Sequence, residues 1–256
     1  MNEGVVKYST VSVVCCYTSE EKLKYLTDSL DEQSQPTERI LIDNSDGRFS
    51  SAAAALNHGA SLCTGDLLLF CHQDIRFKST DSLLDLVKRC AILGEGDVGG
   101  VAGAKQGRTF IMITHGEEEE PYSTGSMFDG DYVGVETVDE CIIIMPKSTW
   151  ESHHFDEEIC DGWHFYAVEQ CLYALLHGHD VYTFLADVNH LSSRGTVNDT
   201  YYRALRKLMA AYSDQVSYIS TSVGYWPRKG LERAIAYRKC IEWARGIAVK
   251  LGLREP

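Results

Sequence analysis

The sequence lacks any long apolar run. None of its segments approaches the ~20 consecutive apolar residues that a membrane-spanning helix needs. The first ten residues, MNEGVVKYST, also lack the apolar stretch of a secretory signal. We therefore expect a protein that stays in the cytoplasm, where it is made.

Paired cysteines are missing as well. The nine cysteines include no CxxC pair, and several of them stand in apolar runs: Cys15, Cys16, Cys71 and Cys141. Thiols in such surroundings behave as small buried hydrophobic groups. We expect reduced thiols and no disulfide framework, as in cytosolic proteins.

The sequence also has neither of two common phosphate-binding fingerprints. No GxGxxG follows the first predicted strand, and no GxxxxGK[ST] occurs anywhere. The formal net charge is −13, whereas nucleic-acid backbones are bound by basic surfaces, so we expect no nucleic-acid partner. An acidic protein that binds a diphosphate needs a divalent cation to neutralise the diphosphate charge.

What is present is typical of a folded α/β protein. Hydrophobic residues make up 44% of the chain, which is too many for a disordered one. Short apolar runs alternate with helical patterns, as in parallel sheets with crossover helices. The patterns predict strands over 11–17, 39–42 and 67–71, and helices that begin at Thr18, near Ser50 and near Thr80.

The second half continues the pattern. A strand is predicted in ECIIIMPKSTW, followed by a helix with an apolar stripe from Phe165 to Leu176 and a strand in VYTFL. ADVNHLSSRG is interpreted as a turn, and two helical stretches, 201–212 and 230–251, form the tail. We expect one domain over 1–195, with a helical extension over 196–256 packed on it. The segment 116–131, which includes the Glu117 to Glu120 run, has loop composition and is a candidate lid.

Polar residues follow the first three predicted strands. Ligands of open α/β sheets bind at the carboxyl ends of the strands, so these side chains are candidates for a binding site. They are Tyr17 and Thr18, Asp43 and Asn44, and His72, Gln73 and Asp74.

Several segments in order resemble glycosyltransferase family 2. They are VSVVCCYTS, LIDNSD, ALNHGASLCTGDLLLFCHQDI, VDECIIIMPKSTW, FDEEICDGWHFYAVEQCLYALLHGHDVYTF and NHLSSRG. The resemblance covers roughly Val11 to Gly195 and looks strongest to the bacterial branch that includes proteins named after streptomycin biosynthesis.

The resemblance implies a GT-A fold, a Rossmann-like, open and mostly parallel sheet flanked by helices. It also implies a metal-dependent, inverting transfer of a sugar from a nucleoside-diphosphate sugar, most often a UDP-sugar, to an acceptor hydroxyl. By position, Asp74 and His190 would bind Mn²⁺ or Mg²⁺, and Glu169 would act as general base.

The resemblance assigns further residues to two binding sites. The nucleotide-sugar would contact Tyr17, Thr18, Asp43, Asn44, Asn57, His72 and Gln73, and the acceptor would contact Asp139, Trp163 and His164. The chain departs from the family where His72 replaces the first aspartate of an Asp-x-Asp motif. Asn44 and Leu56 likewise stand where relatives often have an acid and an arginine.

Other interpretations stay open at this stage. Asp74 is also typical of a turn, His190 of a surface imidazole, and Glu169 of a solvated helix position. A nucleotide-sugar-binding protein without catalysis would share these residues. A sugar nucleotidyltransferase would share them too, but it would release pyrophosphate instead of a nucleoside diphosphate.

The tail carries the opposite charge to the rest. From Arg228 onward, eight Lys or Arg face three Glu, a net of +5, which leaves −18 for the preceding residues. Two hypotheses follow. The tail helix docks on its own acidic domain, or it lies on an anionic membrane where a lipid-linked acceptor is held.

Overall fold

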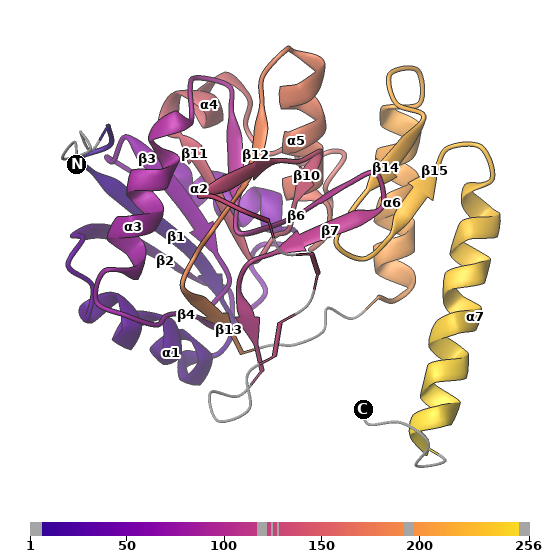
Figure 1. Cartoon of the computed structure of the whole chain (residues 1–256), viewed down its shortest axis with the longest axis horizontal. Helices are drawn as coiled ribbons and strands as arrows, with labels where there is room; N and C mark the ends of the chain where they lie inside the picture. Colours follow the sequence, from indigo (N-terminus) through magenta and orange to yellow (C-terminus); the bar gives the residue numbers. More distant parts are fainter. Residues whose placement is uncertain (1–6, 117–121, 124, 127, 192–196, 251–256) are drawn as a thin grey trace.

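A computed structural model describes residues 7–116, 122–123, 125–126, 128–191 and 197–250. Its centre is a seven-stranded sheet in the order β2-β1-β3-β11-β5-β12-β9 (Figure 1). Five of the strands run in one direction, while β11 and β9 run against their neighbours. The bounds are β1 (Val11–Tyr17), β2 (Thr37–Asp43), β3 (Leu67–Cys71), β5 (Val98–Gly100), β9 (Tyr132–Gly134), β11 (Ile142–Pro146) and β12 (Val181–Phe184).

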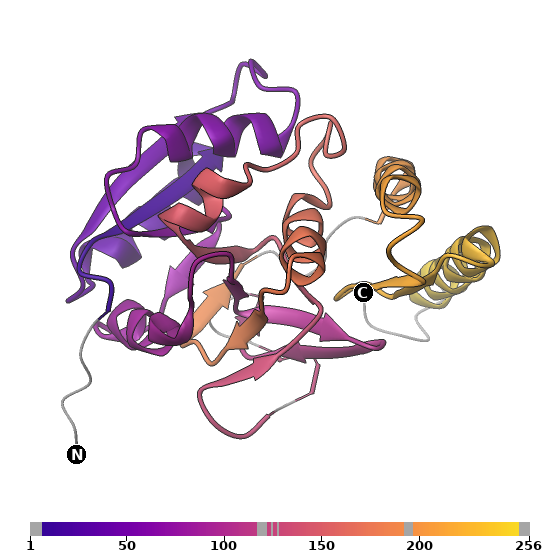
Figure 2. The same ribbon diagram turned by 90° about the horizontal axis from the view of Figure 1, so that it is seen from above.

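Helices cover both faces of this sheet (Figure 2). One face packs on α1 (Glu20–Asp31) and α3 (Ser82–Arg89), which continues as a 3-10 turn, η1 (Cys90–Ile92). The other face packs on α2 (Ala52–Ser61), α4 (Lys147–Ser152) and α5 (Tyr166–Leu176). Because successive strand side chains point to opposite faces and all five residues of β3 are buried, this strand is covered on both faces. The mixed α/β class expected from the sequence is confirmed.

Two smaller sheets flank the centre. One has the order β10-β6-β7 and comprises β10 (Thr137–Val138), β6 (Ala102–Lys105) and β7 (Arg108–Ile111). The other has the order β4-β13-β8 and comprises β4 (Ile75–Phe77), β13 (Val188–His190) and β8 (Thr114–His115). The segment at β13 was interpreted as a turn, and that interpretation was wrong for 188–190, which pairs with strands on both sides.

The C-terminal extension contains more than the two expected helices. Between α6 (Asp199–Ala211) and α7 (Leu231–Lys250) lies a hairpin of β14 (Tyr218–Ser220) and β15 (Tyr225–Pro227). Figure 1 shows these elements together on the side of the sheet beyond α5. Their shared core contains Tyr202, Leu205, Trp226 and Ile235, and it continues onto α5.

Several smaller expectations can be compared with the structure. All nine cysteines are free thiols, and seven are buried. In the described part of the chain, no helix is both long enough and apolar enough to cross a membrane. The Glu117 to Glu120 run lies outside the described residues, as does part of the candidate lid around it.

Candidate functional site

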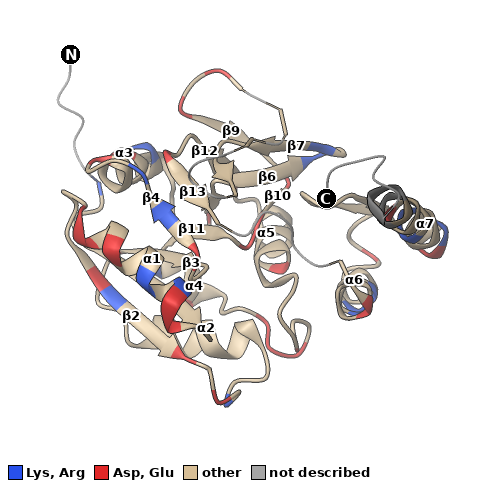
Figure 3. Ribbon diagram, turned by 90° about the horizontal axis from the view of Figure 1, so that it is seen from below, with Lys and Arg blue, Asp and Glu red and all other residues tan. Residues whose placement is uncertain are grey.

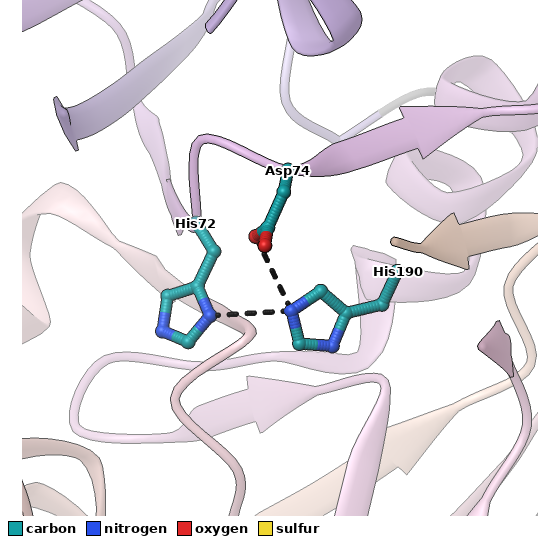
Figure 4. Close-up of side chains that lie close together, drawn as sticks. All are labelled: His72, Asp74 and His190. Atoms are coloured by element: carbon teal, nitrogen blue, oxygen red, sulfur yellow. Dashed lines mark hydrogen bonds and ion pairs between the residues drawn. The ribbon is translucent and has the colours of Figure 1, made fainter. Parts of the chain in front are cut away.

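Strand pairing brings three potential metal ligands together. His72 and Asp74 follow β3, and Asp74 directly precedes β4, which pairs antiparallel with β13 so that Ile75 lies opposite His190. The His190 Nε2 atom lies 3.3 Å from the Asp74 Oδ1 atom and 3.5 Å from the His72 Nδ1 atom (Figure 4). One ligand atom from each residue lies within 4.8 Å of the others.

The electrostatics of the cluster suit a cation. Burial, and then the neighbouring His190, lower the pKa of His72 despite the opposing carboxylates of Asp74 and Asp139, which favours the neutral imidazole that can ligate a metal. A further histidine, His115, stacks at a tilt on His190 with ring centroids 5.7 Å apart. Its two buried nitrogens have no hydrogen-bond partner among the described residues. Two imidazoles and one carboxylate are thus close enough to share one ion, a donor set that fits a divalent transition metal, and a third imidazole, that of His115, lies beside them.

The cluster opens into a cavity of about 450 Å³ at the carboxyl edge of β1 and β3. Its wall is formed by residues that follow these strands, by the start of α2 and by the start of α5. The residues are Cys16, Thr18, Lys22, Ala52, Leu56, Phe70, Cys71, His72, Gln73, Asp74, Glu140, Trp163, Tyr166 and His190. The volume is in the range of small-molecule sites, and the wall combines a metal-ligating cluster, a cation and an aromatic ring.

Two residues of the cavity wall, Gln73 and Lys22, make contacts near the carboxyl end of β1. The Gln73 Oε1 atom accepts hydrogen bonds of 3.0 Å from the backbone N–H groups of both Thr18 and Ser19, which ties the loop after β1 to the loop after β3. Lys22, in the first turn of α1, places its Nζ atom 3.9 Å from the Asp74 carboxylate. A cation beside a metal-ligating carboxylate is suited to binding phosphate oxygens.

Other residues expected to bind the nucleotide-sugar lie beyond this wall. The exposed Asp43 accepts a hydrogen bond from the Ser45 N–H, which lowers the pKa of the carboxyl group. Asn44 is buried and exchanges two hydrogen bonds with the backbone of Phe49. Tyr17 donates a hydrogen bond of 3.3 Å to Glu20.

Asn57 likewise does not line the cavity. Its side-chain oxygen accepts hydrogen bonds from the Trp150 Nε1–H and the Phe155 N–H, and its amide nitrogen donates to the Phe155 carbonyl and to Glu157. These four bonds hold α2 against the segment after α4, which is a structural contact.

The residues expected at the acceptor differ in position. Trp163 is 45% exposed and lines the cavity, where a flat ring can pack against a sugar. Asp139 accepts hydrogen bonds from Ser222, at 2.5 Å, and from the Cys141 N–H. His164 packs edge-on against Tyr201, and burial lowers its pKa. Of these three residues, only Trp163 lines the cavity.

The structure does not bring Glu169 to this cavity. Its side chain is fully buried on the face of α5 that meets α4 and α6. The Oε1 atom accepts a 2.5 Å hydrogen bond from the Tyr212 hydroxyl and lies 3.1 Å from the His153 Nε2 atom. The family resemblance implied a general base at this position, whereas the contacts of the carboxylate in the structure are with Tyr212 and His153.

Two charged residues of the cavity wall, Lys22 and Glu140, were missed by the sequence analysis. The metal-ligating geometry of His72 was missed too, because this residue was assigned to the nucleotide-sugar. The spacing His-x-Asp could have indicated a metal role for His72, since His72 stands at the first position of the Asp-x-Asp motif that the family resemblance places here. Nothing in the sequence distinguishes Glu140 from the neighbouring Asp139.

Comparisons with known proteins agree with the fold. No protein-family model and no curated protein matches the sequence. Among solved structures, one of GalNAc-T7 with UDP, GalNAc and Mn²⁺ matches 80% of this chain with a TM-score of 0.61 and 11% identity. One of S. aureus TarS in complex with UDP-GlcNAc matches 78% with a TM-score of 0.54 and 16% identity.

This chain spans 48% of the GalNAc-T7 chain and 66% of that TarS chain. At these low identities the likeness shows the fold alone. The fold is the GT-A fold of glycosyltransferases, with a large central sheet between two layers of helices.

Proposed function

We propose that this protein is a metal-dependent glycosyltransferase that uses a nucleoside-diphosphate sugar as donor. The observation that carries the proposal is the cluster of His72, Asp74 and His190 at the carboxyl edge of a GT-A sheet, beside a cavity of about 450 Å³. UDP is the nucleotide we propose, since the similar GalNAc-T7 and TarS structures contain UDP and UDP-GlcNAc. The acceptor is a hydroxyl of a glycan, a lipid-linked molecule or a small molecule.

The donor set favours Mn²⁺ over Mg²⁺. Imidazole nitrogen suits transition metals, whereas Mg²⁺ prefers oxygen ligands and gives up its water reluctantly. His72 and His190 would bind the ion through nitrogen and Asp74 through oxygen. When bound, the ion would neutralise charge on the departing nucleoside diphosphate.

Neighbouring residues complete the proposed donor site. Lys22 lies within reach of phosphate oxygens that approach Asp74, while Thr18 and Gln73 shape the wall where the nucleoside enters. Asp43, which follows β2, is our proposed contact for the outer part of the nucleoside. Trp163 offers a ring face to the sugar or the acceptor. The reaction we propose is a direct displacement at the anomeric carbon with inversion.

The test begins with binding. Thermal stabilisation by UDP, GDP, dTDP and CMP, each with Mn²⁺, with Mg²⁺ or without metal, identifies the nucleotide, because a ligand that binds only the folded state raises its stability. We expect UDP with Mn²⁺ to stabilise most. Asp74→Ala should abolish the metal-dependent part, and Asp214→Ala, at an exposed carboxylate of the extension, is the matched control. An Asp74→Ala variant with unchanged Mn²⁺ affinity would refute the metal site.

The products then separate the remaining alternatives. A glycosyltransferase releases a nucleoside diphosphate from its donor, a nucleotidyltransferase releases pyrophosphate, and a binding protein without catalysis releases neither. We expect UDP release from a UDP-sugar in the presence of Mn²⁺. Release of pyrophosphate, or tight binding without any turnover, would assign the protein to the other class.

A further proposal concerns where the acceptor is held. Part of α7 presents basic and aromatic side chains to solvent, and we propose that this surface contacts an anionic membrane on the cytoplasmic side. A lipid-linked acceptor would then be presented near the cavity.

A further inference from the structure

Glu140 lies at the same edge of the sheet as the metal-ligating cluster. It lies two residues before β11, whose antiparallel pairing places Ile142 opposite Cys71, the last residue of β3. An antiparallel strand begins where its neighbour ends, so the residues before β11 join those after β3. Glu140 accordingly lines the cavity together with Asp74, His190 and Trp163.

The carboxylate of Glu140 is held by the start of α5. It accepts hydrogen bonds from the backbone N–H groups of Phe165 and Tyr166. No side chain of the chain segment before α5 caps this helix, and Phe165 takes a left-handed conformation with φ of +72°. A left-handed backbone residue next to a cavity residue, Tyr166, stabilised by a carboxylate from the turn before β11, is typical of a site that fixes the position of a reactive group.

The surroundings of Glu140 also favour its protonated form. Burial, and then the charge of Asp139, raise the pKa of Glu140 to about 8, against the opposing hydrogen bonds from α5. Burial raises the pKa of the neighbouring Cys160, Tyr166 and Tyr201, so these groups are neutral at neutral pH. The titratable or charged side chains that line the same cavity are Lys22, His72, Asp74 and His190. A carboxylate whose pKa is close to the working pH is well matched to proton transfer.

We propose that Glu140, and not Glu169, is the proton acceptor for the acceptor hydroxyl, an inference that rests on the proposed glycosyltransferase function. As the hydroxyl oxygen forms its bond to the anomeric carbon, its proton passes to the Glu140 carboxylate. The bond from that carbon to the diphosphate oxygen breaks, and the electron pair leaves with the nucleoside diphosphate. When no other acceptor is present, water takes the place of the hydroxyl and the donor is hydrolysed.

Contacts of the two glutamates distinguish their roles. Glu169 is fully buried, and its carboxylate contacts Tyr212 and His153. Glu140 faces the cavity that contains the metal-ligating cluster, and its hydrogen bonds come from backbone N–H groups that cannot compete for a proton. Only the second arrangement leaves a carboxylate accessible to a substrate.

The experiment measures binding and turnover separately in the full-length protein. Glu140→Gln keeps the size of the side chain and removes its basicity, and Glu158→Gln, at an exposed loop position, is the matched control. With UDP-GlcNAc or UDP-GalNAc and Mn²⁺, we expect Glu140→Gln to retain the affinities for Mn²⁺ and UDP and to lose about 10²- to 10⁴-fold in UDP release. The wild-type rate should rise with pH and level off above about 8, and the variant should lose this rise.

A stability measurement distinguishes a reactive carboxylate from a structural one. Because the folded protein holds the pKa of Glu140 above its ordinary value of 4.5, ionisation opposes folding, and stability is lost as pH rises from about 4.5 to about 8. Glu140→Gln should therefore melt at a higher temperature than the wild type, with a gap that widens over this range. A purely structural carboxylate predicts the opposite sign.

Three outcomes would overturn the inference in distinguishable ways. Wild-type protein that binds neither Mn²⁺ nor any nucleotide would remove the proposed function and this inference with it. Wild-type turnover in Glu140→Gln would remove only the role of Glu140. A variant that melts lower and loses Mn²⁺ and UDP binding together with turnover would show that Glu140 is structural.

Discussion

At the residue scale, the candidate metal cluster differs by two side chains from an all-oxygen set of ligands. His72 contributes nitrogen where an aspartate would contribute oxygen, and His190 contributes a second nitrogen. Two imidazoles and one carboxylate also occur in non-haem iron sites, so the donor set alone does not identify the metal. The proposal of Mn²⁺ combines this donor set, which favours a transition metal over Mg²⁺, with the proposed glycosyltransferase function.

The first residue-scale prediction concerns metal preference. His72→Asp replaces a nitrogen ligand by an oxygen ligand, so the affinity for Mg²⁺ should rise relative to that for Mn²⁺ and Zn²⁺. Titration calorimetry with each ion measures the ratio. His58→Asp, at a site on α2 that does not line the cavity, is the control. An unchanged ratio in His72→Asp would show that His72 does not bind the ion.

The second residue-scale prediction concerns the buried carboxylate of Glu169. Tyr212→Phe removes the hydroxyl that donates to it at 2.5 Å, and a buried charge that loses such a bond should reduce the free energy of unfolding by about 1.5–3 kcal/mol. Tyr237→Phe, whose ring is 70% exposed, is the matched control and should have no effect. Denaturant unfolding measures both.

Glu169→Gln tests the role that the family resemblance implied for Glu169. If Glu169 were the proton acceptor, Glu169→Gln would lose turnover while keeping its stability. The contacts with His153 and Tyr212 predict a loss of stability instead. Comparing the melting temperature with the rate per folded molecule decides between these outcomes.

Residue identity predicted part of this site. Asp74 and His190 were assigned to the metal from their positions in motifs, and the structure places them 3.3 Å apart. Glu140 could not be assigned in this way, because its position depends on β11 running antiparallel to β3. An apolar strand pattern carries no information about the direction of its neighbour.

At the element scale, the loops after β1 and β3 are joined by one side chain. Gln73 accepts from two backbone N–H groups at the start of α1, where Ser19 caps the helix by accepting from the Lys22 N–H. The sequence analysis placed this helix start at Thr18, one residue early. Ser and Thr are both favoured cap residues, so composition alone does not separate adjacent positions.

The element-scale prediction follows from that contact. Gln73→Ala leaves two N–H groups without their acceptor, so the free energy of unfolding should fall by about 1–2 kcal/mol. Nucleotide affinity should fall as well, because the loop with Thr18 loses its support. Gln215→Ala, at an exposed position of the extension, is the control. A variant with unchanged nucleotide affinity would show that the loop is positioned without Gln73.

Element patterns predicted the N-terminal half better than the C-terminal half. Strands of at least five residues, such as β1 and β3, stand out by their apolar runs. The hairpin of β14 and β15 was not predicted, since each strand has three residues and is too short for a period to appear. The same holds for β13, whose pairing with β4 completes the cluster.

At the scale of the whole molecule, α7 is joined to α6 by ion pairs in which each helix supplies both signs of charge. Arg206 of α6 makes a bidentate ion pair with Glu232 of α7 at 2.6 and 2.7 Å, and Lys239 lies 2.6 Å from Asp199. Ile235 is buried in the core shared with α5 and α6. Figure 3 shows charges of both signs on the two helices. The first turns of α7 thus dock on the protein itself.

The outer side of α7 is different. Tyr237 and Trp243 are 70% and 72% exposed, and Cys240 and Ile247 lie exposed between and beyond them on the same side of the helix. Spacings of three and four residues place side chains on one helix face. Exposed aromatic rings on a helix that also carries basic side chains are typical of surfaces that enter the headgroup region of an anionic membrane. The docked and the membrane-bound hypotheses therefore describe opposite sides of one helix.

The whole-molecule prediction tests this outer side. Full-length protein should co-sediment with vesicles that contain anionic lipid at low salt, and salt near 0.15 M should release it, because a Debye length of about 8 Å then screens the surface charges. The double variant Tyr237→Ser with Trp243→Ser should lose the binding without unfolding, since both rings are largely exposed. Leu62→Ser, at an exposed position after α2, is the control and should bind as the wild type does. Neutral vesicles should bind neither the wild type nor either variant at any salt concentration, because they offer no anionic headgroups to the basic side chains of α7. If full-length protein ignores anionic vesicles even at low salt, α7 is a structural element only, and the acceptor is to be sought among molecules in solution.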